Sequence, residues 1–280
     1  SRTLSRYDLM CDRVAAQVIA QYSTSFSLAT RFLAPRVRTD VRNLYAMVRI
    51  ADEIVDGAAG ADAAQLLDAY ETQVLAAPAA RFHTDPVLHA WANSARRCDF
   101  SAEHVTAFFA SMRRDLNQST YDPADFDAYV YGSAEVVGLM CLRVFLADEP
   151  DAQASYDRLA PGARCLGAAF QKVNFLRDIA ADRDELGRRY FPGVDPHRID
   201  DADRDRLLDD LDNDLALAAA AVEQLPPSSR RAVRVAHRLF AELSGRLRET
   251  PVERLRHERV RVPGPRKAAI VLDSVVRGRR

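Results

Sequence analysis

Residues 44–56 read LYAMVRIADEIVD, and this stretch predicts a helix that is packed on most of its sides. On a helix, Tyr45, Arg49, Asp52 and Asp56 fall at positions i, i+4, i+7 and i+11 and share one face. Two carboxylates one turn apart are costly to bury unless a cation neutralises them. Mg²⁺ prefers oxygen ligands and commonly takes one or two carboxylates together with the phosphates of a substrate. The polar stripe therefore predicts a metal–phosphate site.

A second stretch, residues 170–182, reads FQKVNFLRDIAAD and repeats the construction of the first. Gln171, Asn174, Asp178 and Asp182 share one helical face, while the other faces are apolar. One acidic pair of this kind is explained as well by the solvated face of an ordinary surface helix. The recurrence of the pattern, each time with its own arginine, favours a ligand site instead. Two such stripes facing each other would enclose a cavity with a metal–diphosphate site at its mouth.

The composition indicates an all-α protein. Hydrophobic residues make up 48% of the 280 residues, which is enough for a sizeable core, and glycine is sparse. No run alternates polar and apolar residues as a strand would. No linker or shift in composition suggests a boundary, so residues 1–280 are expected to form a single domain. The net charge of −1 gives no indication of a nucleic-acid partner.

Cysteines and apolar runs favour a cytoplasmic protein. The four cysteines are far apart and form no CxxC pair, so we expect free thiols in a reducing compartment rather than zinc ligands. No apolar run approaches the ~20 residues that span a bilayer. The arginine-rich tail, residues 253–280, could be solvated, contact phosphate or attract anionic lipid, and the sequence leaves these alternatives open.

Local signals along the chain add expectations about helix ends, packing and phosphate contacts. The hydroxyl groups of residues 22–30 could either cap a helix or donate hydrogen bonds to phosphate oxygens. The two glycines of residues 57–60 are expected to end the first aspartate helix. Gly132 and Gly138 interrupt a helical pattern at a cost of about 1 kcal/mol each, which indicates close helix packing or a kink. Residues 185–192 form a basic, aromatic loop that either covers a diphosphate or is simply solvated.

These motifs resemble those of the phytoene synthase and squalene synthase family, the head-to-head prenyl diphosphate synthases, and most of all a bacterial phytoene synthase. The resemblance rests on five motifs that occur in family order over almost the whole chain: Ser-Thr-Ser-Phe at 23–26, the stretch 45–57, the stretch 171–182, Gly-Arg-Arg-Tyr-Phe-Pro at 187–192 and His-Glu-Arg-Val at 257–260. It implies an isoprenoid-synthase fold, a single-domain helical bundle around a central cavity.

The resemblance also implies roles for individual residues. Several Mg²⁺ ions that bridge the substrate diphosphates would be held by Asp52, Asp56, Asn174, Asp178 and Asp182. The four aspartates, together with Tyr45, would be catalytic. Substrate or diphosphate would be contacted by Ser25, Phe26, Thr30, Tyr45, Arg49, Gln171, Arg177, Tyr190 and Arg259. One departure stands out: many family members place a tyrosine where Phe240 aligns, so a phenol contact is missing and Phe240 can supply only pocket wall.

The activity implied by the resemblance is a Mg²⁺-dependent prenyl transfer of carotenoid or related isoprenoid biosynthesis, with allylic prenyl diphosphates as substrates. Mg²⁺ and arginines stabilise a departing diphosphate, and the double bond of a second substrate attacks the allylic cation. The cyclopropyl diphosphate so formed ionises again and rearranges to the linear product. Thr30 lies one helical turn after Phe26 and is small, which favours two C20 geranylgeranyl diphosphates giving phytoene.

Other functions stay open at this point. A C15 version would give squalene, dehydrosqualene or presqualene diphosphate, and a class I terpene cyclase could be built on the same scaffold. A helical scaffold without turnover is a further alternative, against which the four aspartates argue. The sequence does not indicate an oligomeric state. Because the product is very apolar, we expect a cytoplasmic enzyme that touches the inner face of the membrane peripherally.

Overall fold

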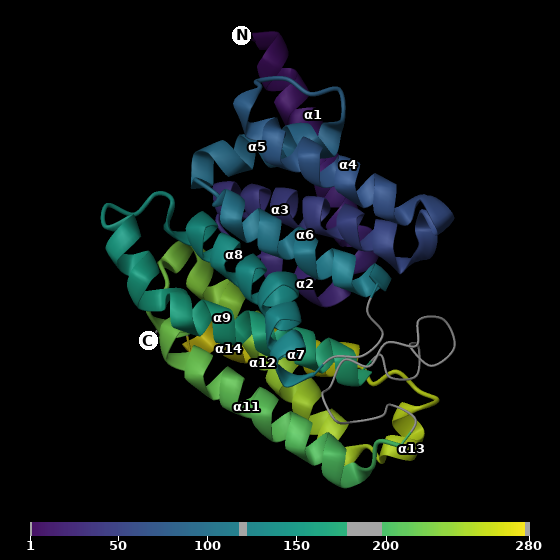
Figure 1. The fold of residues 1–280 in the computed structure, drawn as a ribbon. Coiled ribbons are helices and arrows are strands. Elements are labelled where there is room, and N and C mark those ends of the chain that lie inside the picture. Colours follow the sequence, from purple (N-terminus) through teal and green to yellow (C-terminus); the bar gives the residue numbers. More distant parts are fainter. Residues whose placement is uncertain (1, 118–121, 178–197, 278–280) are drawn as a thin grey trace.

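The computed structural model describes residues 2–117, 122–177 and 198–277, and within these ranges the protein is built from helices, with no strand (Figure 1). This confirms the all-α prediction. The helices and helical turns are α1 (Arg2–Tyr22), α2 (Thr24–Thr30), α3 (Pro35–Glu53), η1 (Ile54–Ala58), η2 (Gly60–Asp62), α4 (Ala63–Ala76), η3 (Ala77–Ala79), α5 (Pro86–Cys98), α6 (Ala102–Asn117), α7 (Pro123–Val130), η4 (Tyr131–Glu135), α8 (Val136–Leu146), α9 (Ala152–Arg177), α11 (Asp201–Glu223), α12 (Pro227–Glu249), α13 (Val252–Leu255) and α14 (Gly264–Arg277).

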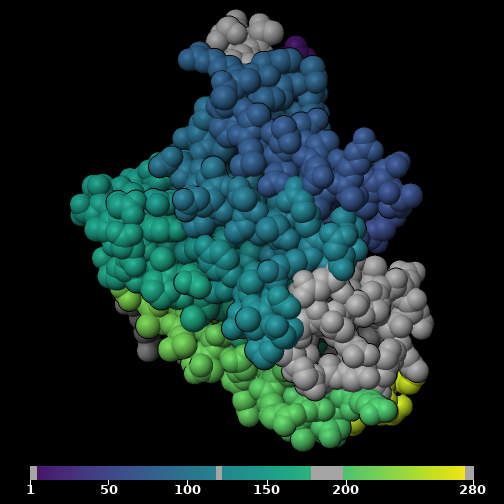
Figure 2. All heavy atoms as spheres, in the orientation of Figure 1, coloured from purple at the N-terminus to yellow at the C-terminus, as the bar shows by residue number. Residues whose placement is uncertain are grey.

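The helices pack as two groups that meet along α8. Helices α1, α3, α4, α5 and α6 lie in the upper part of Figure 1, and α9, α11, α12 and α14 lie in the lower part. The upper group buries a core around Trp91, Phe108 and Phe109, and the lower group buries a core that includes Leu176 and Leu208. On the face drawn in Figure 2, the atoms of α6 to α9 lie between the N-terminal helices and α11. Helix α9 packs along α11 and α8, which places residues 170–177, the described part of the second stretch, against these helices.

Helix starts follow the capping chemistry of the sequence. Asp85 accepts hydrogen bonds from the first turn of α5, and Asp122 accepts one from the first turn of α7; a proline follows each of them as the first helical residue. Asp200 and Asp203 form a reciprocal capping box at the start of α11. These side chains satisfy backbone N–H groups that have no partner inside the helix. The starts of α5, α7 and α11 are therefore fixed locally by the sequence.

Glycines allow the helices of the bundle to approach one another closely. A Cβ atom on Gly138 would lie 2.5 Å from the Ala163 carbonyl oxygen of α9, and one on Gly167 would lie 2.5 Å from the Ala134 carbonyl oxygen of η4. A Cβ atom on Gly132 would collide with α6. The expectation of close packing at Gly132 and Gly138 is confirmed. Between α7 and α8, the chain forms the π-helical segment η4.

One helical run has the length and composition of a membrane span. It covers Pro123–Leu146, which is the continuous run of α7, η4 and α8, and half of its most apolar window is buried inside the bundle. By length and composition, the expectation that no segment approaches a span is therefore wrong for this run. Because α8 and η4 pack against α9 and α6, the run is a core helix of the bundle. Core helices of soluble proteins can have the same length and apolar composition as a membrane span.

Candidate functional site

The C-terminal end of α3 gathers three carboxylates around one guanidinium. Arg49 forms ion pairs with Asp52 at 3.6 Å and with Asp56 at 3.3 Å, and a shorter one with Glu53. All four side chains are partly exposed. Carboxylates at the C-terminal end of a helix also oppose its macrodipole, which favours cations there. The stripe predicted from residues 44–56 is thus present at one helix end, and its electrostatics favour a bound cation.

The pKa of Asp52 reflects the burial and the repulsion between carboxylates at this helix end. Burial is the main cause that raises its pKa to about 7, against the opposing attraction of Arg49, and repulsion from Asp56 and Asp115 adds to the shift. About a third of the Asp52 side chain remains accessible. A divalent cation would relieve the repulsion, and carboxylate oxygens are the ligands that Mg²⁺ prefers. The donor set of Asp52 and Asp56 therefore fits Mg²⁺.

The backbone after Asp52 leaves the regular α-helix. Ile54–Ala58 form the π-helical turn η1, in which Gly57 has φ = 111°, and Gly60 follows with φ = 57°. Positive φ values of this size favour glycine, so the chain turns at the positions where the sequence predicted the helix end. Single π-helical turns are frequent at functional sites. Here the turn carries Asp56 at the exposed end of the stripe.

Tyr22 at the end of α1 adds a contact that the sequence did not single out. The Arg49 guanidinium lies over the Tyr22 ring, 4.4 Å from its centroid. The Tyr22 phenol also helps to lower the pKa of the Glu53 carboxyl, after the larger effect of Arg49. Tyr22 itself is exposed. It therefore holds Arg49 and Glu53 together at the open side of the stripe.

Tyr45 occupies the middle of the same face of α3. It is half-buried, and burial raises the pKa of its phenol to about 12. Asp52 and Tyr22 act in the same direction, while Arg49 opposes them. The phenol is thus kept protonated at neutral pH, so it can donate a hydrogen bond or present its ring face and does not act as a phenolate nucleophile.

The second stretch lies at the C-terminal end of α9. Arg177 donates a 3.0 Å hydrogen bond to the Asn174 side-chain oxygen, and Gln171 is half-buried one turn earlier. Asp178, Asp182 and Tyr190 lie outside the described residues. Among the residues that the structure describes, no group of three or more His, Cys, Asp or Glu side chains is close enough together to hold a metal ion.

Two residues that the sequence analysis missed lie between the stretches. The Tyr129 hydroxyl donates a 3.2 Å hydrogen bond to Asp115 of α6, and its ring packs 5.8 Å from Phe175 of α9. Asp115 in turn lies close enough to Asp52 to raise the pKa of that carboxyl. The contacts therefore run from the first stretch through α6 and α7 to the second. No periodic pattern could have indicated this, because the relation depends on how three helices pack.

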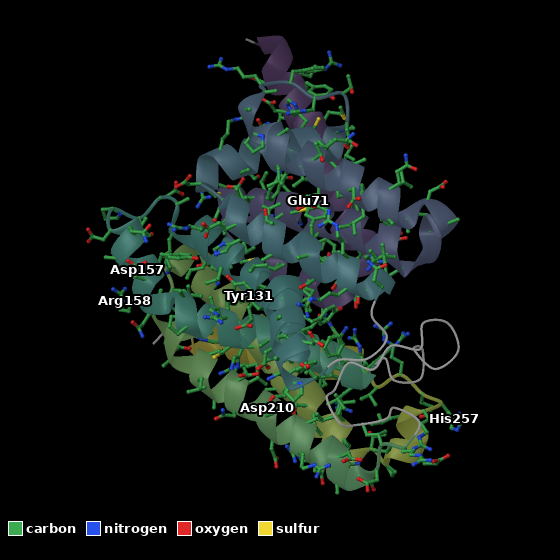
Figure 3. The ribbon with its side chains drawn as sticks, in the orientation of Figure 1. Glu71, Tyr131, Asp157, Arg158, Asp210 and His257 are labelled. Carbon is green, nitrogen blue, oxygen red and sulfur yellow. The ribbon has the colours of Figure 1, made fainter. Side chains whose placement is uncertain are left out.

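Lys172 belongs to the second stretch but faces away from its polar stripe. Its ammonium lies 2.5 Å from Asp210 and 2.7 Å from Asp214 on α11, and the side chain is buried (Asp210 is labelled in Figure 3). A buried ammonium needs such partners. Lys172 thus holds α9 against α11 and is structural, whereas Asn174 lies on the opposite face.

An aromatic cluster lies next to α2. Phe170 and Phe240 stack with their centroids 4.1 Å apart, and Phe26 lies 5.6 Å from each of them. Phe240 is thus packed within the aromatic cluster, and its part in lining a hydrocarbon pocket stays a prediction. Thr30 is buried, and its hydroxyl donates a 2.9 Å hydrogen bond to the Ser27 carbonyl oxygen of the same helix.

The hydroxyl-rich stretch starts as a helix cap. The Ser23 side chain accepts a hydrogen bond from the Phe26 backbone N–H, so the capping interpretation holds for Ser23. Ser25 is half-buried in the first turn of α2. Lys267 of α14 approaches the neighbouring Thr24 hydroxyl at 3.4 Å. Ser25 therefore stands beside the aromatic cluster and close to the end of α1, where Tyr22 holds Arg49.

Arg259 lies in a different part of the molecule. It follows α13, close to His257 in Figure 3, and is exposed. It borders an open hollow of 390 Å³ together with Arg246, Arg254 and Arg261. Glu249 and Glu258 also line this hollow. Because the arginines outnumber these two glutamates, the hollow is predominantly basic. The described contacts do not bring Arg259 to the end of α3, and its role in substrate binding stays a prediction.

Comparison with known proteins supports this picture. Residues 19–266 match the family model described as squalene/phytoene synthase. A 15-cis-phytoene synthase of Paracoccus sp. is 30% identical over 84% of this chain and 81% of its own length. A 15-cis-phytoene synthase of Synechocystis sp. is 31% identical over 69% of this chain and 59% of its own length.

Solved structures share the fold. A dehydrosqualene synthase in complex with ligand matches 99% of this chain and 98% of its own with a TM-score of 0.80 at 20% identity. A squalene synthase from Alicyclobacillus acidocaldarius matches 89% of this chain and 95% of its own with a TM-score of 0.75 at 23% identity. These likenesses bear on the fold, which is that of the isoprenoid synthases.

Proposed function

Because the chain belongs to the squalene/phytoene synthase family, we propose that it is a prenyltransferase that joins two allylic prenyl diphosphates head to head. The observation that carries the proposal is the end of α3, where three carboxylates surround Arg49 and burial raises the pKa of Asp52 to about 7. A site of this kind attracts Mg²⁺ and, through it, the diphosphate of a substrate. The ligands in this proposal are Asp52, Asp56, Asn174, Asp178 and Asp182.

The residues around the site fit the ionisation of an allylic diphosphate. Bound Mg²⁺ would supply Lewis-acid stabilisation of the leaving diphosphate. Arg49 and Arg177 would donate hydrogen bonds to its oxygens, since a guanidinium matches phosphate geometry. When Asp52 and Asp56 bind cations, Arg49 loses two of its three partners and its N–H groups become available. Tyr22 and Glu53 would then keep the guanidinium oriented.

The aromatic cluster fits the second requirement, a cation protected from water. Phe26, Phe170 and Phe240 exclude water from the hydrocarbon side, and their ring faces stabilise positive charge without acting as nucleophiles. In the proposed reaction each substrate loses its C–O bond to diphosphate, new C–C bonds join the two chains, and two protons leave. The balance requires no reductant for a phytoene product.

We assign the C20 substrate on the basis of Thr30. It is buried at the end of α2, one turn beyond Phe26, and its side chain is small and folded back onto its own helix. A side chain of this size would leave more space beyond Phe26 than a bulky residue would, which favours a longer substrate chain. The proposal is that two geranylgeranyl diphosphates give phytoene through a cyclopropyl diphosphate.

Product analysis tests the proposal directly. Purified protein with Mg²⁺ is incubated separately with C15 and C20 all-trans prenyl diphosphates, and the hexane extract is analysed by mass. A C40 hydrocarbon from the C20 substrate, lost in Asp52→Asn and kept in Asp68→Asn, is the expected result. Asp68 is a matched control because it is an exposed aspartate of α4 that pairs with Arg113 and is not among the proposed ligands. A C30 product would overturn the chain-length assignment, and absence of diphosphate release from either substrate would overturn the function.

We also propose that the enzyme acts in the cytoplasm and delivers its product to the inner face of the membrane. The substrates carry a water-soluble diphosphate, whereas the product is a hydrocarbon. Fractionation should find the protein in the soluble or salt-extractable fraction. Retention in the membrane after high salt and alkaline washing would contradict this placement.

A further inference from the structure

The polar stripe of α3 continues beyond the residues of the candidate site. Arg38 and Arg42 precede Tyr45 and Arg49 at helical spacing, so all four lie on one face of the helix. The carboxylates gather at the C-terminal end of the stripe, and arginines gather at its N-terminal end. Arg42 and Asp52 are ten residues apart, which is about 15 Å along a helix. The arginine end is thus separate from the metal end.

Arg42 has no partner within the described residues. It takes part in no hydrogen bond or ion pair, and its Nε atom is buried without a hydrogen-bond partner. Burial lowers the pKa of its guanidinium, and the nearby charges of Arg38 and Arg31 lower it further. No carboxylate is among the groups that act on it. A half-buried cation whose charged neighbours are all cations is destabilising unless an anion joins it.

Arg38 and Arg31 complete the cluster. Arg38 donates hydrogen bonds to the carbonyl oxygens of Arg31 and Leu33, which follow α2, but its Nε atom is likewise buried without a partner. Arg31 is exposed at the end of α2. Arg38 and Arg42 are also like charges at i and i+4, near the positive end of the α3 dipole. Each of these effects works against the folded protein when the cluster is empty.

We propose that Arg31, Arg38 and Arg42 form a binding site for a phosphate group, separate from the metal end of α3 and not required by the proposed condensation. Arginine suits such a ligand because its planar N–H groups match phosphate oxygens, and three guanidinium groups balance a multiply charged anion. The phosphate could belong to free inorganic diphosphate or to the headgroup of an anionic lipid. The two sources share the same chemistry, and the experiment distinguishes them.

The test begins with inorganic diphosphate in the presence of EDTA, so that no divalent cation bridges it to the carboxylates. Binding is measured by calorimetry at constant ionic strength for the wild type, Arg42→Gln and Arg81→Gln. Arg81 is a matched control, since it is an exposed arginine distant in sequence from the cluster. The expected result is that Arg42→Gln weakens binding roughly tenfold or more, while Arg81→Gln keeps it.

A second arm uses vesicles of zwitterionic lipid with and without an anionic phospholipid, in a co-sedimentation assay. Binding to anionic vesicles that depends on Arg42, without binding of free diphosphate, identifies a lipid headgroup as the ligand. Binding of free diphosphate that depends on Arg42 identifies a soluble ligand. If neither diphosphate nor anionic vesicles bind in a manner that depends on Arg42, the proposal is overturned.

Stability without ligand gives an independent check. An empty site of like charges predicts that Arg42→Gln is at least as stable as the wild type in phosphate-free buffer, and that added diphosphate raises the melting temperature of the wild type alone. If Arg42→Gln is clearly less stable in phosphate-free buffer, Arg42 serves the fold and the proposal fails. Because the site lies apart from the metal end, this outcome is independent of whether the condensation occurs.

Discussion

Helix α3 carries two clusters of aspartate and arginine, and they are built in opposite ways. Asp40 is fully buried and lies between two guanidinium groups, those of Arg36 at 2.8 Å and Arg97. Ser94 donates a 2.6 Å hydrogen bond to the same carboxylate. At Asp40, two guanidinium groups surround one carboxylate. One turn of helix beyond Tyr45, three partly exposed carboxylates surround the one guanidinium group of Arg49.

The pKa values follow this difference. Burial alone would raise the pKa of Asp40, but the hydrogen bonds from Arg97 and Ser94 and the charge of the arginines outweigh burial and hold it below its usual range. At Asp52 the single nearby arginine does not outweigh burial, and the pKa rises to about 7. The comparison teaches that charge ratio and access, rather than residue type, separate a structural aspartate from a candidate ligand. The predictions below test that distinction.

The largest effect is expected at Asp40. Asp40→Asn removes the anion that neutralises Arg36 and Arg97 and should lower the free energy of unfolding by roughly 3–5 kcal/mol, as the loss of one partner of a buried ion pair does. Denaturant titration followed by circular dichroism measures it. The activity per folded molecule should be unchanged. A loss of activity at wild-type stability would mean that the two clusters are not distinct.

At Asp52 and Asp56, by contrast, substitutions are expected to lower activity and not stability. Asp52→Asn or Asp56→Asn should lower the turnover by something on the order of 10²–10³-fold, comparable to the loss of one preorganised electrostatic group at a reacting diphosphate. Without metal, the same variants should be at least as stable as the wild type, because one of several like charges is gone. Steady-state release of diphosphate and thermal melting measure the two quantities. A variant that melts much earlier and reacts normally would reverse the assignment.

The pH dependence of stability should report Asp40. Its pKa is lower in the folded than in the unfolded protein, so its stabilisation is present above the unfolded value of about 3.9 and is lost as the pH falls through the folded value. The wild type should therefore lose stability relative to Asp40→Asn as the buffer is taken from pH 5 downward. Unfolding curves for both proteins at several acidic pH values measure this. Parallel curves over that range would show that Asp40 is not held ionised.

The smallest effect is expected at Tyr22. Its ring contributes a cation–π contact to Arg49 of roughly 0.5–1 kcal/mol, so Tyr22→Leu should raise the KM for substrate a few-fold. Tyr22→Phe keeps the ring and should recover most of this affinity, and its remaining deficit reports the hydroxyl contact with Glu53. Equal KM values for Tyr22→Leu and the wild type would show that Arg49 is oriented without the ring.

Features carried by local periodicity could be predicted from the sequence. The stripe from Tyr45 to Asp56, its end at Gly57 and the close packing at Gly138 all depend on helical spacing or on one glycine and its neighbours. Tyr22 and Asp115 could not be found in this way, because their relation to the stripe is created when α1 and α6 pack beside α3.

The second stretch shows the same limit. Helical spacing separates Lys172 from Asn174, but it does not reveal that Lys172 is held by Asp210 and Asp214, which lie 38 and 42 residues later on α11. The run of α7, η4 and α8 was not expected as a single apolar helix, because charged residues interrupt it in the sequence. Pair contacts between distant elements are therefore what the structure adds.

The glycine contacts of α8 and α9 have a consequence for how such an enzyme can diversify. Where Gly138 and Gly167 let backbone atoms of neighbouring helices touch, the spacing of the helices is set by the main chain and not by the side chains of the hydrocarbon wall. Residues such as Thr30 and Phe240 can then change during evolution while the helices that carry the acidic stretches keep their positions. In the proposed reaction, single substitutions at such positions would alter the size of the product, while the frame of helices is kept at the low identities seen among the relatives.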